Sequence, residues 1–424
     1  MVAELFTACS GSAMLTAWGL ALHCETLLFA VVGALPYLAQ LAQLPAAWLV
    51  TQRGARGTTV IAVGSARLLP LLLAPLPFLP IALAKQQAIF VGVVAASALL
   101  GVAGNNGWAT WMGELVPSRL RGRYFGRRTA LCTLAGTLGA LGTGLLVDAA
   151  HKHGLDAHAL SMLALLACAL GVVSNGLMRR QIDARVERSI PRWSQLVEPW
   201  RDPAMRRAVG FNLGWNAAVG LAATLFQVHM VRNLGLGMLA VSIYVAAYAL
   251  ARMLTAPLWG AAIDRVGCRP VIVLCAIGIA LDPAIWLFAS PTTLWPLFVD
   301  VLVGGTLWAG LNQAVFQLPL RIAPRRGRAF HLAAFSASGG LAFALASAIG
   351  GVIAQTLPAK MVVHAHVISS FEIVFLLSTV ARLASLVLAA KLREPGAHKV
   401  EALLHLVSAH GRVLGVRLPA RTAK

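Results

Sequence analysis

The chain consists of long apolar runs separated by short polar loops, and twelve of these runs approach the roughly 20 residues that a helix needs to cross a membrane. We expect the spans at residues 2–21, 27–50, 58–82, 86–113, 127–149, 158–179, 208–231, 236–262, 270–290, 293–318, 328–356 and 366–390. Strands of a membrane barrel would be about ten residues long and would alternate strictly between apolar and polar positions. The pattern therefore predicts an all-α membrane protein with twelve transmembrane helices.

The composition agrees with this interpretation, because 58% of the residues are hydrophobic and only 12% are charged, against about 25% charged in an ordinary soluble domain. The six cysteines form no CxxC pair, and we expect neither a disulfide framework nor a metal site. His151, His153 and His158 are interpreted as part of a solvated loop rather than as zinc ligands. The chain lacks a phosphate-binding loop of the Walker type, so we expect no cofactor and no nucleotide as an energy source.

The net charge of +20 comes from arginine-rich loops. If residue 1 is cytoplasmic, the loops on the cytoplasmic side, the helix ends beside them and the C-terminal tail hold 28 of the 35 Lys and Arg residues. The positive-inside rule then predicts a protein of the plasma membrane, the inner membrane in a bacterium, with both termini cytoplasmic and with basic loops beside anionic membrane lipid. Nucleic acid is not expected as a partner, because the basic residues form short loops rather than one face of a folded domain.

The chain also contains an internal repeat. The stretch "LVPSRLRGRYF" at 115–125 returns as "IAPRRGRAF" at 322–330, about half the chain further on. We therefore predict an N-terminal six-helix half, a cytoplasmic linker, a C-terminal six-helix half and a basic cytoplasmic tail, at residues 1–180, 181–207, 208–392 and 393–424. Such repeats are typical of secondary transporters, which hold their substrate near the midplane between the halves.

One loop resembles a family signature. The stretch "GAAIDRVGCRP" at 260–270 resembles the loop of the major facilitator superfamily in which Gly, Asp, Arg, Gly and Arg recur between the second and third helices of each half. The first-half loop, "LVTQRGARG" at 49–57, departs from that pattern because Gln52 stands where the acid is expected. The resemblance covers about residues 1–392, and it implies that spans 1, 4, 7 and 10 line a central cavity.

Amides and tryptophans on these four spans are the candidates for substrate binding, since they would suit a neutral or amphipathic organic solute. They are Trp18, Asn105, Asn106, Trp108, Trp111, Asn212, Trp215, Asn216, Trp308, Asn312 and Gln313. Asn105 stands twelve residues before Pro117, which corresponds to about 18 Å of helix and hence to midplane depth. The alternative is that the amides join neighbouring helices and the tryptophans fill space.

Ionisable residues within spans are costly and are usually paired or functional. Arg252 and Asp282 are expected at similar depth on consecutive helices, either as a structural ion pair, which we favour, or with Asp282 as a proton carrier. Asp300 is an alternative protonation site. Arg67 and Arg382 are expected on peripheral helices, where their side chains can reach the interface.

The cytoplasmic loops contain the candidates for a gate. We expect Glu114 to pair with Arg53 or Arg56, and Asp264 to pair with Arg321 or Arg269 or to approach the positive end of the helix that begins near Arg127. The alternative is that these charges are solvated. The remaining gate candidates are Arg121, Arg123, Arg265, Arg326 and Arg328.

These features predict a secondary active transporter that moves a small organic solute by alternating access, with protons as the candidate coupling ion. The alternative is a receptor derived from a transporter, or an enzyme embedded in the membrane. An enzyme is not expected, because the 15 acidic residues are scattered along the chain. We expect a monomer. The tail, with Val400, Leu403, Leu404 and Val407, is predicted to form a helix on the inner leaflet.

Overall fold

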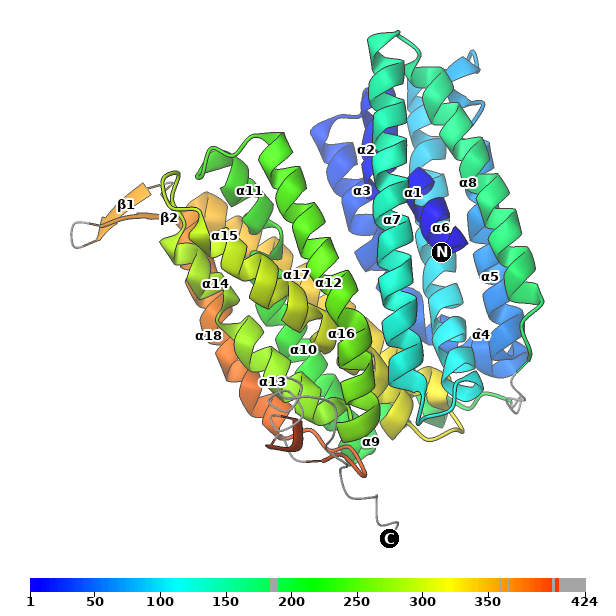
Figure 1. Ribbon diagram of the computed structural model, residues 1–424. Helices are drawn as coiled ribbons and strands as arrows, with labels where there is room; N and C mark the ends of the chain where they lie inside the picture. Colours follow the sequence, from blue (N-terminus) through cyan, green and yellow to red (C-terminus); the bar gives the residue numbers. More distant parts are fainter. Residues whose placement is uncertain (184–189, 359, 364–365, 399–400, 404–424) are drawn as a thin grey trace.

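The computed structural model describes the chain except for residues 184–189, 359, 364–365, 399–400 and 404–424. Two helical bundles stand side by side, in contact at one end and leaning apart toward the other (Figure 1). The first bundle ends with α8, and the second begins with α10. Most of the predicted tail helix lies outside the described residues.

The first bundle contains eight α-helices and three short 3-10 segments among its described residues. They are α1 (Val2–Ser10), α2 (Ser12–Ala21), α3 (Thr26–Leu38), η1 (Ala39–Ala42), α4 (Gln43–Arg53), α5 (Ala55–Leu68), η2 (Leu69–Leu72), η3 (Leu76–Phe78), α6 (Leu83–Leu115), α7 (Arg121–Lys152) and α8 (Asp156–Arg179). The predicted cytoplasmic linker contains η4 (Trp193–Leu196) and α9 (Glu198–Arg201).

The second bundle has the same plan and adds a β-hairpin. Its elements are α10 (Pro203–Ala223), α11 (Leu225–Arg232), α12 (Met238–Val266), α13 (Cys268–Ala280), α14 (Asp282–Ile285), η5 (Trp286–Phe288), α15 (Trp295–Val299), the π-helix η6 (Asp300–Gly304), α16 (Gly305–Ile322), α17 (Arg328–Thr356), β1 (Lys360–Val363), β2 (His366–Ser369) and α18 (Ser370–Ala390). The hairpin of β1 and β2 projects from the end opposite the contact between the bundles (Figure 1).

Nine helical segments of the described chain are long and apolar enough to cross a membrane. The other predicted spans, 2–21, 27–50 and 293–318, are also helical but are built from shorter helices. Gly11 has extended backbone between α1 and α2, Pro36 lies inside α3, and a π-turn separates α15 from α16. The predicted all-α arrangement is therefore confirmed as a membrane fold, with interrupted helices that hydropathy alone does not reveal.

One predicted boundary was wrong in an informative way. Residues 366–369 were expected to start the last span, but they form β2. The last helix begins only at Ser370, because Ser369 and Glu372 form a capping box. The Glu372 side chain accepts a hydrogen bond from the Ser369 backbone N–H at 2.8 Å, and the Ser369 hydroxyl accepts one from the Glu372 N–H at 3.3 Å.

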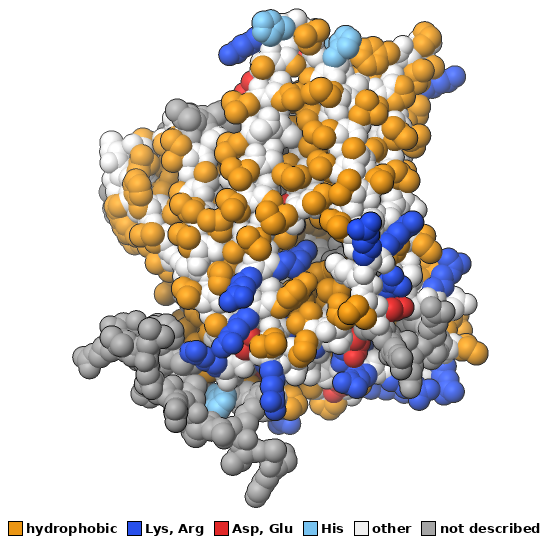
Figure 2. Space-filling view, turned by 45° about the vertical axis from the view of Figure 1, so that its right-hand side comes forward, with side chains coloured by type: hydrophobic (Ala, Val, Ile, Leu, Met, Phe, Trp, Pro, Cys, Tyr) orange, Lys and Arg blue, Asp and Glu red, His pale blue; other side chains and the backbone are white. Residues whose placement is uncertain are grey.

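Hydrophobic and basic side chains occupy different levels of the molecular surface. Hydrophobic side chains cover most of the visible face, and Lys and Arg side chains gather toward the end at which the bundles touch (Figure 2). The chain is an integral membrane protein by its apolar helices and its fold. Met1 lies at mid-height in the first bundle, where its amino group is 3.8 Å from the Cys132 sulfur.

Glycines allow the two bundles to approach closely at their common end. A Cβ atom on Gly122 would lie 2.1 Å from the backbone oxygen of Gly260, and one on Gly126 would lie 2.7 Å from the backbone oxygen of Ala256. Both distances are far below van der Waals contact, so α7 and α12 can cross here only because these positions lack side chains. This crossing joins the first turn of α7 to the last turns of α12.

Candidate functional site

A central cavity of about 890 Å³ lies at the junction of the two halves. Asn105 on α6 and Asn312 on α16 both line it, and they occupy equivalent positions in the sequence repeat. Trp108 and Gln313, two other predicted binding residues, also line this cavity. The structure thus brings together four candidates from two helices that are about 200 residues apart in the sequence.

An aromatic cluster lines the cavity between the halves. The Trp108 ring stacks on Phe316 of the other half with a centroid distance of 6.0 Å, and Phe125 packs edge-on against Phe316 at 5.0 Å. The guanidinium of Arg128 lies 4.5 Å above the Trp108 ring, within the range of a cation–π interaction. Phe316 therefore touches α6 and α7 directly, and separating the halves here would expose these rings.

On the arginine-rich side of this cluster, Asp264 holds the start of α7. Its carboxylate accepts hydrogen bonds from the backbone N–H groups of Gly122 at 2.6 Å and of Arg123 at 2.8 Å. These N–H groups have no partner within the helix, and the helix dipole makes them favour an anion. Arg321, on α16, lies 3.7 Å from the same carboxylate. The expected approach of Asp264 to the positive end of this helix is thus present as direct hydrogen bonds.

Glu114 forms a second bridge between the halves, and the predicted partners of this residue were wrong. Its carboxylate pairs with Arg328 on α17 and lies 3.8 Å from Arg325. Arg56 instead donates to the backbone oxygen of Arg179 at 2.5 Å, and Arg53 is exposed. The prediction considered only partners within one half, whereas the packing of the bundles brings the start of α17 beside the end of α6.

Arg121 and Arg321 form further contacts at the arginine-rich end. Arg121 donates to the backbone oxygen of Leu320 in the other half at 3.2 Å and to that of Gly113 at 2.6 Å. Arg321 forms an ion pair of 3.1 Å with Glu394, a residue of the predicted tail. Glu394 also accepts from the Arg269 backbone N–H at 2.8 Å. Sequence reasoning missed Glu394, although an isolated acid in a basic segment was a usable signal.

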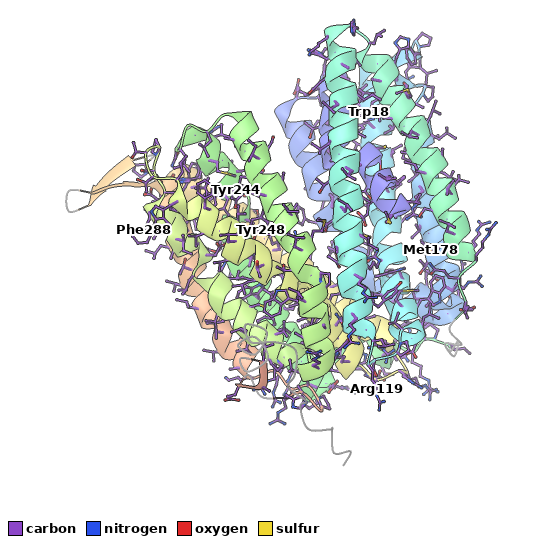
Figure 3. The ribbon with its side chains drawn as sticks, in the orientation of Figure 1. Trp18, Arg119, Met178, Tyr244, Tyr248 and Phe288 are labelled. Atoms are coloured by element: carbon purple, nitrogen blue, oxygen red, sulfur yellow. The ribbon has the colours of Figure 1, made fainter. Side chains whose placement is uncertain are left out.

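The other gate candidates have smaller roles in the structure. Arg265 and Arg326 are exposed, and Arg123 contributes its backbone N–H. Arg119, although not a gate candidate, marks the same end of the molecule in Figure 3. The charged residues that join the two halves are therefore Glu114, Asp264, Arg121 and Arg328, while Arg321 supports Asp264 from within the second half.

A buried cluster of charge occupies the second half at the level of the π-helix. Asp282, Asp300 and Arg382 are each more than nine-tenths buried. Arg382 lies 3.7 Å from the Asp282 carboxylate, and the hydroxyl of Tyr244 donates to Asp300. Asp282 and Asp300 also line one small cavity together. The π-turn places Asp300 in this cluster, and such turns are frequent at functional sites.

The predicted pair of Arg252 with Asp282 was wrong. Asp282 begins α14 and faces Arg382 on α18, so the arginine that was expected at the periphery is the buried counter-charge. Arg252 instead lines the central cavity and also a smaller cavity of about 320 Å³ that contains Asp282 and Asp300. Arg252 is thus the charged residue common to the two spaces.

Tyr244 and Tyr248 stand one turn apart on α12 in the second half, as Figure 3 shows. Both line the smaller cavity, together with Trp308, another predicted binding residue. In the first half, Trp18 lines a separate cavity of about 570 Å³ that it shares with Asn105.

The remaining predicted binding residues are engaged in helix packing. The Asn106 side chain donates to the backbone oxygen of Ala329 at 3.2 Å, and the Trp111 ring donates to that of Ile182 at 3.1 Å. These two bonds use the polar atoms that were expected to meet solute. Asn106 is rotated by about 100° around α6 from Asn105, whereas Trp111 lies one turn beyond Trp108, nearer the end of the helix.

The polar group of α10 is also committed to packing. Asn212 donates to the backbone oxygen of Phe335 at 2.7 Å, and Asn216 donates to the backbone oxygen of Asn212 at 2.8 Å. Trp215 is buried, and its ring packs at 6.3 Å from that of Trp308. Asn212 therefore joins α10 to α17, and Trp215 packs against Trp308 of α16.

The comparisons agree with this architecture. The family model described as Major Facilitator Superfamily matches residues 213–409. A human protein, major facilitator superfamily domain-containing protein 10, is 29% identical over 116 residues, which span 27% of this chain and 24% of that protein. The class E tetracycline resistance protein of Escherichia coli is 38% identical over 63 residues, 15% of each chain. The matched segments thus span less than a quarter of these relatives.

Solved structures match over nearly the whole chain. The proton:xylose symporter XylE has a TM-score of 0.70 at 14% identity, covering 96% of this chain and 97% of that one. The E. coli fucose:proton symporter FucP has a TM-score of 0.70 at 12% identity, covering 93% and 98%. A bacterial homologue of the iron transporter ferroportin in an outward-facing state has a TM-score of 0.68 at 12% identity, covering 92% and 98%.

Two helical bundles that meet at one end around a central cavity define the class as a membrane protein with a transporter fold. The second half of the chain matches the model of the Major Facilitator Superfamily, and the fold of the whole chain is similar to that of the solved transporters named above.

Proposed function

We propose that the protein is a secondary active transporter that moves a small organic solute by alternating access and that couples this movement to protons. The observation that carries the proposal is the position of the central cavity, which lies between the halves at the depth of Asn105 and Asn312. On the arginine-rich side it is bounded by the aromatic cluster and the ion pairs, and the bundles lean apart on the other side (Figure 1).

This arrangement corresponds to an outward-facing state when the arginine-rich end is placed in the cytoplasm. We assign the protein to the plasma membrane, the inner membrane in a bacterium, with that end inside. Opening toward the cytoplasm requires the Asp264 and Glu114 bridges to break, together with the contacts of Phe316. A few kcal/mol of bias is sufficient to shift such an equilibrium, and a bound solute can supply it.

The second half supplies the site proposed for proton binding. We infer that Asp282 and Asp300 share one proton, because two buried carboxylates in one cavity repel each other. Arg382 and Tyr244 are placed to stabilise the charge that remains when this proton leaves. The smaller cavity borders both carboxyls, and we infer that protons reach them through it. Intramembrane carboxyls of this kind commonly form proton relays.

Transport in vesicles tests this proposal. The purified protein is placed in liposomes that contain a pH-sensitive dye, and solutes are added with and without an imposed pH gradient. The panel includes small organic acids and the solutes named for similar proteins, which are xylose, fucose and tetracycline. We expect at least one solute to move with protons, and we expect gradient-driven uptake to fall about tenfold or more in Asp282→Asn and Asp300→Asn, because an amide cannot carry the proton.

Two comparisons make the result decisive. Arg232→Gln alters an exposed arginine at the end of α11, outside the proposed machinery, and should transport normally. Solute exchange at equal pH on both sides should persist in the Asp282→Asn variant, which separates loss of coupling from loss of folding. If no solute crosses under any gradient, transport is excluded and a receptor derived from this fold becomes the better interpretation.

A further inference from the structure

The charged side chains that line the central cavity all have one sign. They are Arg67, Arg128 and Arg252, and no Asp or Glu lines this cavity in the described part of the chain. Arg128 lies close over the Trp108 ring, which leaves its guanidinium less available to a solute than those of Arg67 and Arg252. A cavity with this charge attracts anions and repels cations.

Arg67 is the most informative of the three because it is buried without a counter-ion. It lies on α5 with 8% of its surface exposed, and its Nη1 atom has no hydrogen-bond partner among the described residues. Its guanidinium lies 5.7 Å from the centre of the Phe6 ring. A charge in this position is costly unless something pairs with it, so an unpaired buried arginine beside a cavity indicates a ligand.

The nearest acid does not fulfil that role. Glu4 lines the 570 Å³ cavity and attracts Arg67 electrostatically. The two side chains form no ion pair in the described part of the chain, and the Glu4 carboxylate lies toward Gly136 of α7 instead. Arg67 itself lines both the 570 Å³ and the 890 Å³ cavities, next to Asn105 in each. The Arg67 side chain therefore borders both spaces that a solute could occupy.

We propose that Arg67 is the docking site for the oxyanion group of a small organic acid and that the transported substrate is an anion of this class. This inference rests on the proposed transport function and adds the chemical class of its substrate. The guanidinium offers a planar pair of donors that matches a carboxylate, and charge-assisted bonds of this kind are short and strong. The Asn105 amide and the Trp108 ring, on the same cavity, would hold the uncharged part of the molecule.

The second half is arranged to respond to such a substrate. Arg252 borders both the central cavity and the one that contains Asp282 and Asp300. An anion near Arg252 offsets the positive field that this arginine exerts on the two carboxyls, so proton uptake becomes easier when the anion is bound. Anion and proton would then favour each other's binding, as cotransport requires.

Binding of matched ligand pairs tests the proposal. The full chain in lipid nanodiscs is titrated with benzoate and benzamide, and with indole-3-acetate and indole-3-acetamide, and binding is followed by calorimetry. Each pair has nearly the same shape and differs in charge. We expect the acids to bind roughly tenfold or more tightly than the amides, the effect of one charge-assisted contact. Phenyl phosphate and benzenesulfonate show whether the site prefers carboxylates or accepts other oxyanions.

Variants identify the residue. Arg67→Gln should abolish the preference for acids while leaving amide binding unchanged, and Arg67→Lys should retain part of the preference because it keeps the charge. Arg232→Gln, which removes an exposed arginine, should bind like the parent. The proposal is overturned if no pair shows a preference for the acid, or if Arg67→Gln keeps the preference.

The binding test is independent of flux. A preference for acids that depends on Arg67, without transport in vesicles, would contradict the proposed function and leave the anion site in place. Transport of neutral solutes alone, without a preference for acids, would support the proposed function and remove the anion site.

Discussion

The two halves of the molecule close the arginine-rich end with equivalent helices but with different acids. In the second half, Asp264 at the end of α12 docks on the first turn of α7. The equivalent position of the first half is Gln52, which is exposed, and there Glu114 at the end of α6 pairs with Arg328, the first residue of α17. In both halves an acid binds the first turn of the helix after the arginine-rich loop, α7 or α17, which is called the receiving helix below. The acid itself comes from a different position in each half.

Because of this difference, the two contacts at the arginine-rich end are expected to contribute unequally to closure. Asp264 binds backbone N–H groups, which stay in place whatever the side chains of α7 are. Glu114 binds a side chain, and one of its two arginine partners, Arg325, is mostly exposed. The exposed pair with Arg325 contributes about 0–1 kcal/mol. The pair with Arg328 is buried but depends on one flexible side chain, whereas Asp264 binds two backbone donors. The contact between α12 and α7 is therefore expected to dominate closure, and the contact between α6 and α17 is expected to adjust it.

The largest effect should come from the glycine that permits the dominant contact. Gly122→Val places a side chain against the backbone oxygen of Gly260, which a Cβ atom would already approach to 2.1 Å. We expect the bundles to be unable to close on the arginine-rich side and transport to fall by more than about tenfold. Spin labels at Arg119→Cys and Arg326→Cys, two exposed positions in opposite halves, should report a longer distance.

Gly142→Val is the matched control, because this glycine lies on the same helix with no atom within 4 Å of an added Cβ. The labelled variants also replace Cys24 and Cys132, the two native cysteines that are not buried. An unchanged distance between the labels in Gly122→Val would show that the crossing of α7 and α12 does not control closure.

A smaller but still large effect is expected at Asp264. Asp264→Arg puts a positive charge against the N-terminus of α7 and beside Arg321, so closure is weakened and transport should fall about tenfold. Adding Arg321→Asp should recover only part of this loss, because it restores an opposite pair but not the two backbone hydrogen bonds. Initial rates of uptake in vesicles measure both variants. Normal transport by the single variant, or no recovery in the double variant, would exclude a role for the Asp264 contact in closure.

The fold was largely predictable from the sequence, because each span carries its own apolar signal and the repeat fixes how the halves correspond. The cavity was partly predictable, since Asn105 and Asn312 follow from the repeat and both line it. The ion pairs were not. Arg328 with Glu114, and Arg382 with Asp282, join helices that are distant in the sequence, and depth alone does not say which residues share a face.

Two arginines show the limit most clearly. Arg67 and Arg382 were expected at the periphery because their helices are not among the four that were expected to line the cavity. Arg382 is instead buried against Asp282, and Arg67 lines the central cavity. Their position within apolar spans was the usable signal, since a charge at such depth needs a partner or a ligand.

The smallest effect should follow from making the two halves alike. Gln52→Asp restores the missing acid at the end of α4, a helix that packs against α17. If the receiving helix alone specifies the contact, the new carboxylate should find the first turn of α17 and strengthen closure. Because this position is exposed and Arg328 is already paired with Glu114, the gain should stay within about 0–1 kcal/mol. The distance between the labels at positions 119 and 326 should shorten slightly, and uptake should slow about twofold or less.

The same substitution in a Glu114→Gln background should have a larger effect, since the start of α17 then has a free arginine. If Gln52→Asp acts equally in both backgrounds, or loosens the closed end, the two halves do not use equivalent receiving helices, and the asymmetry extends beyond the identity of the acid.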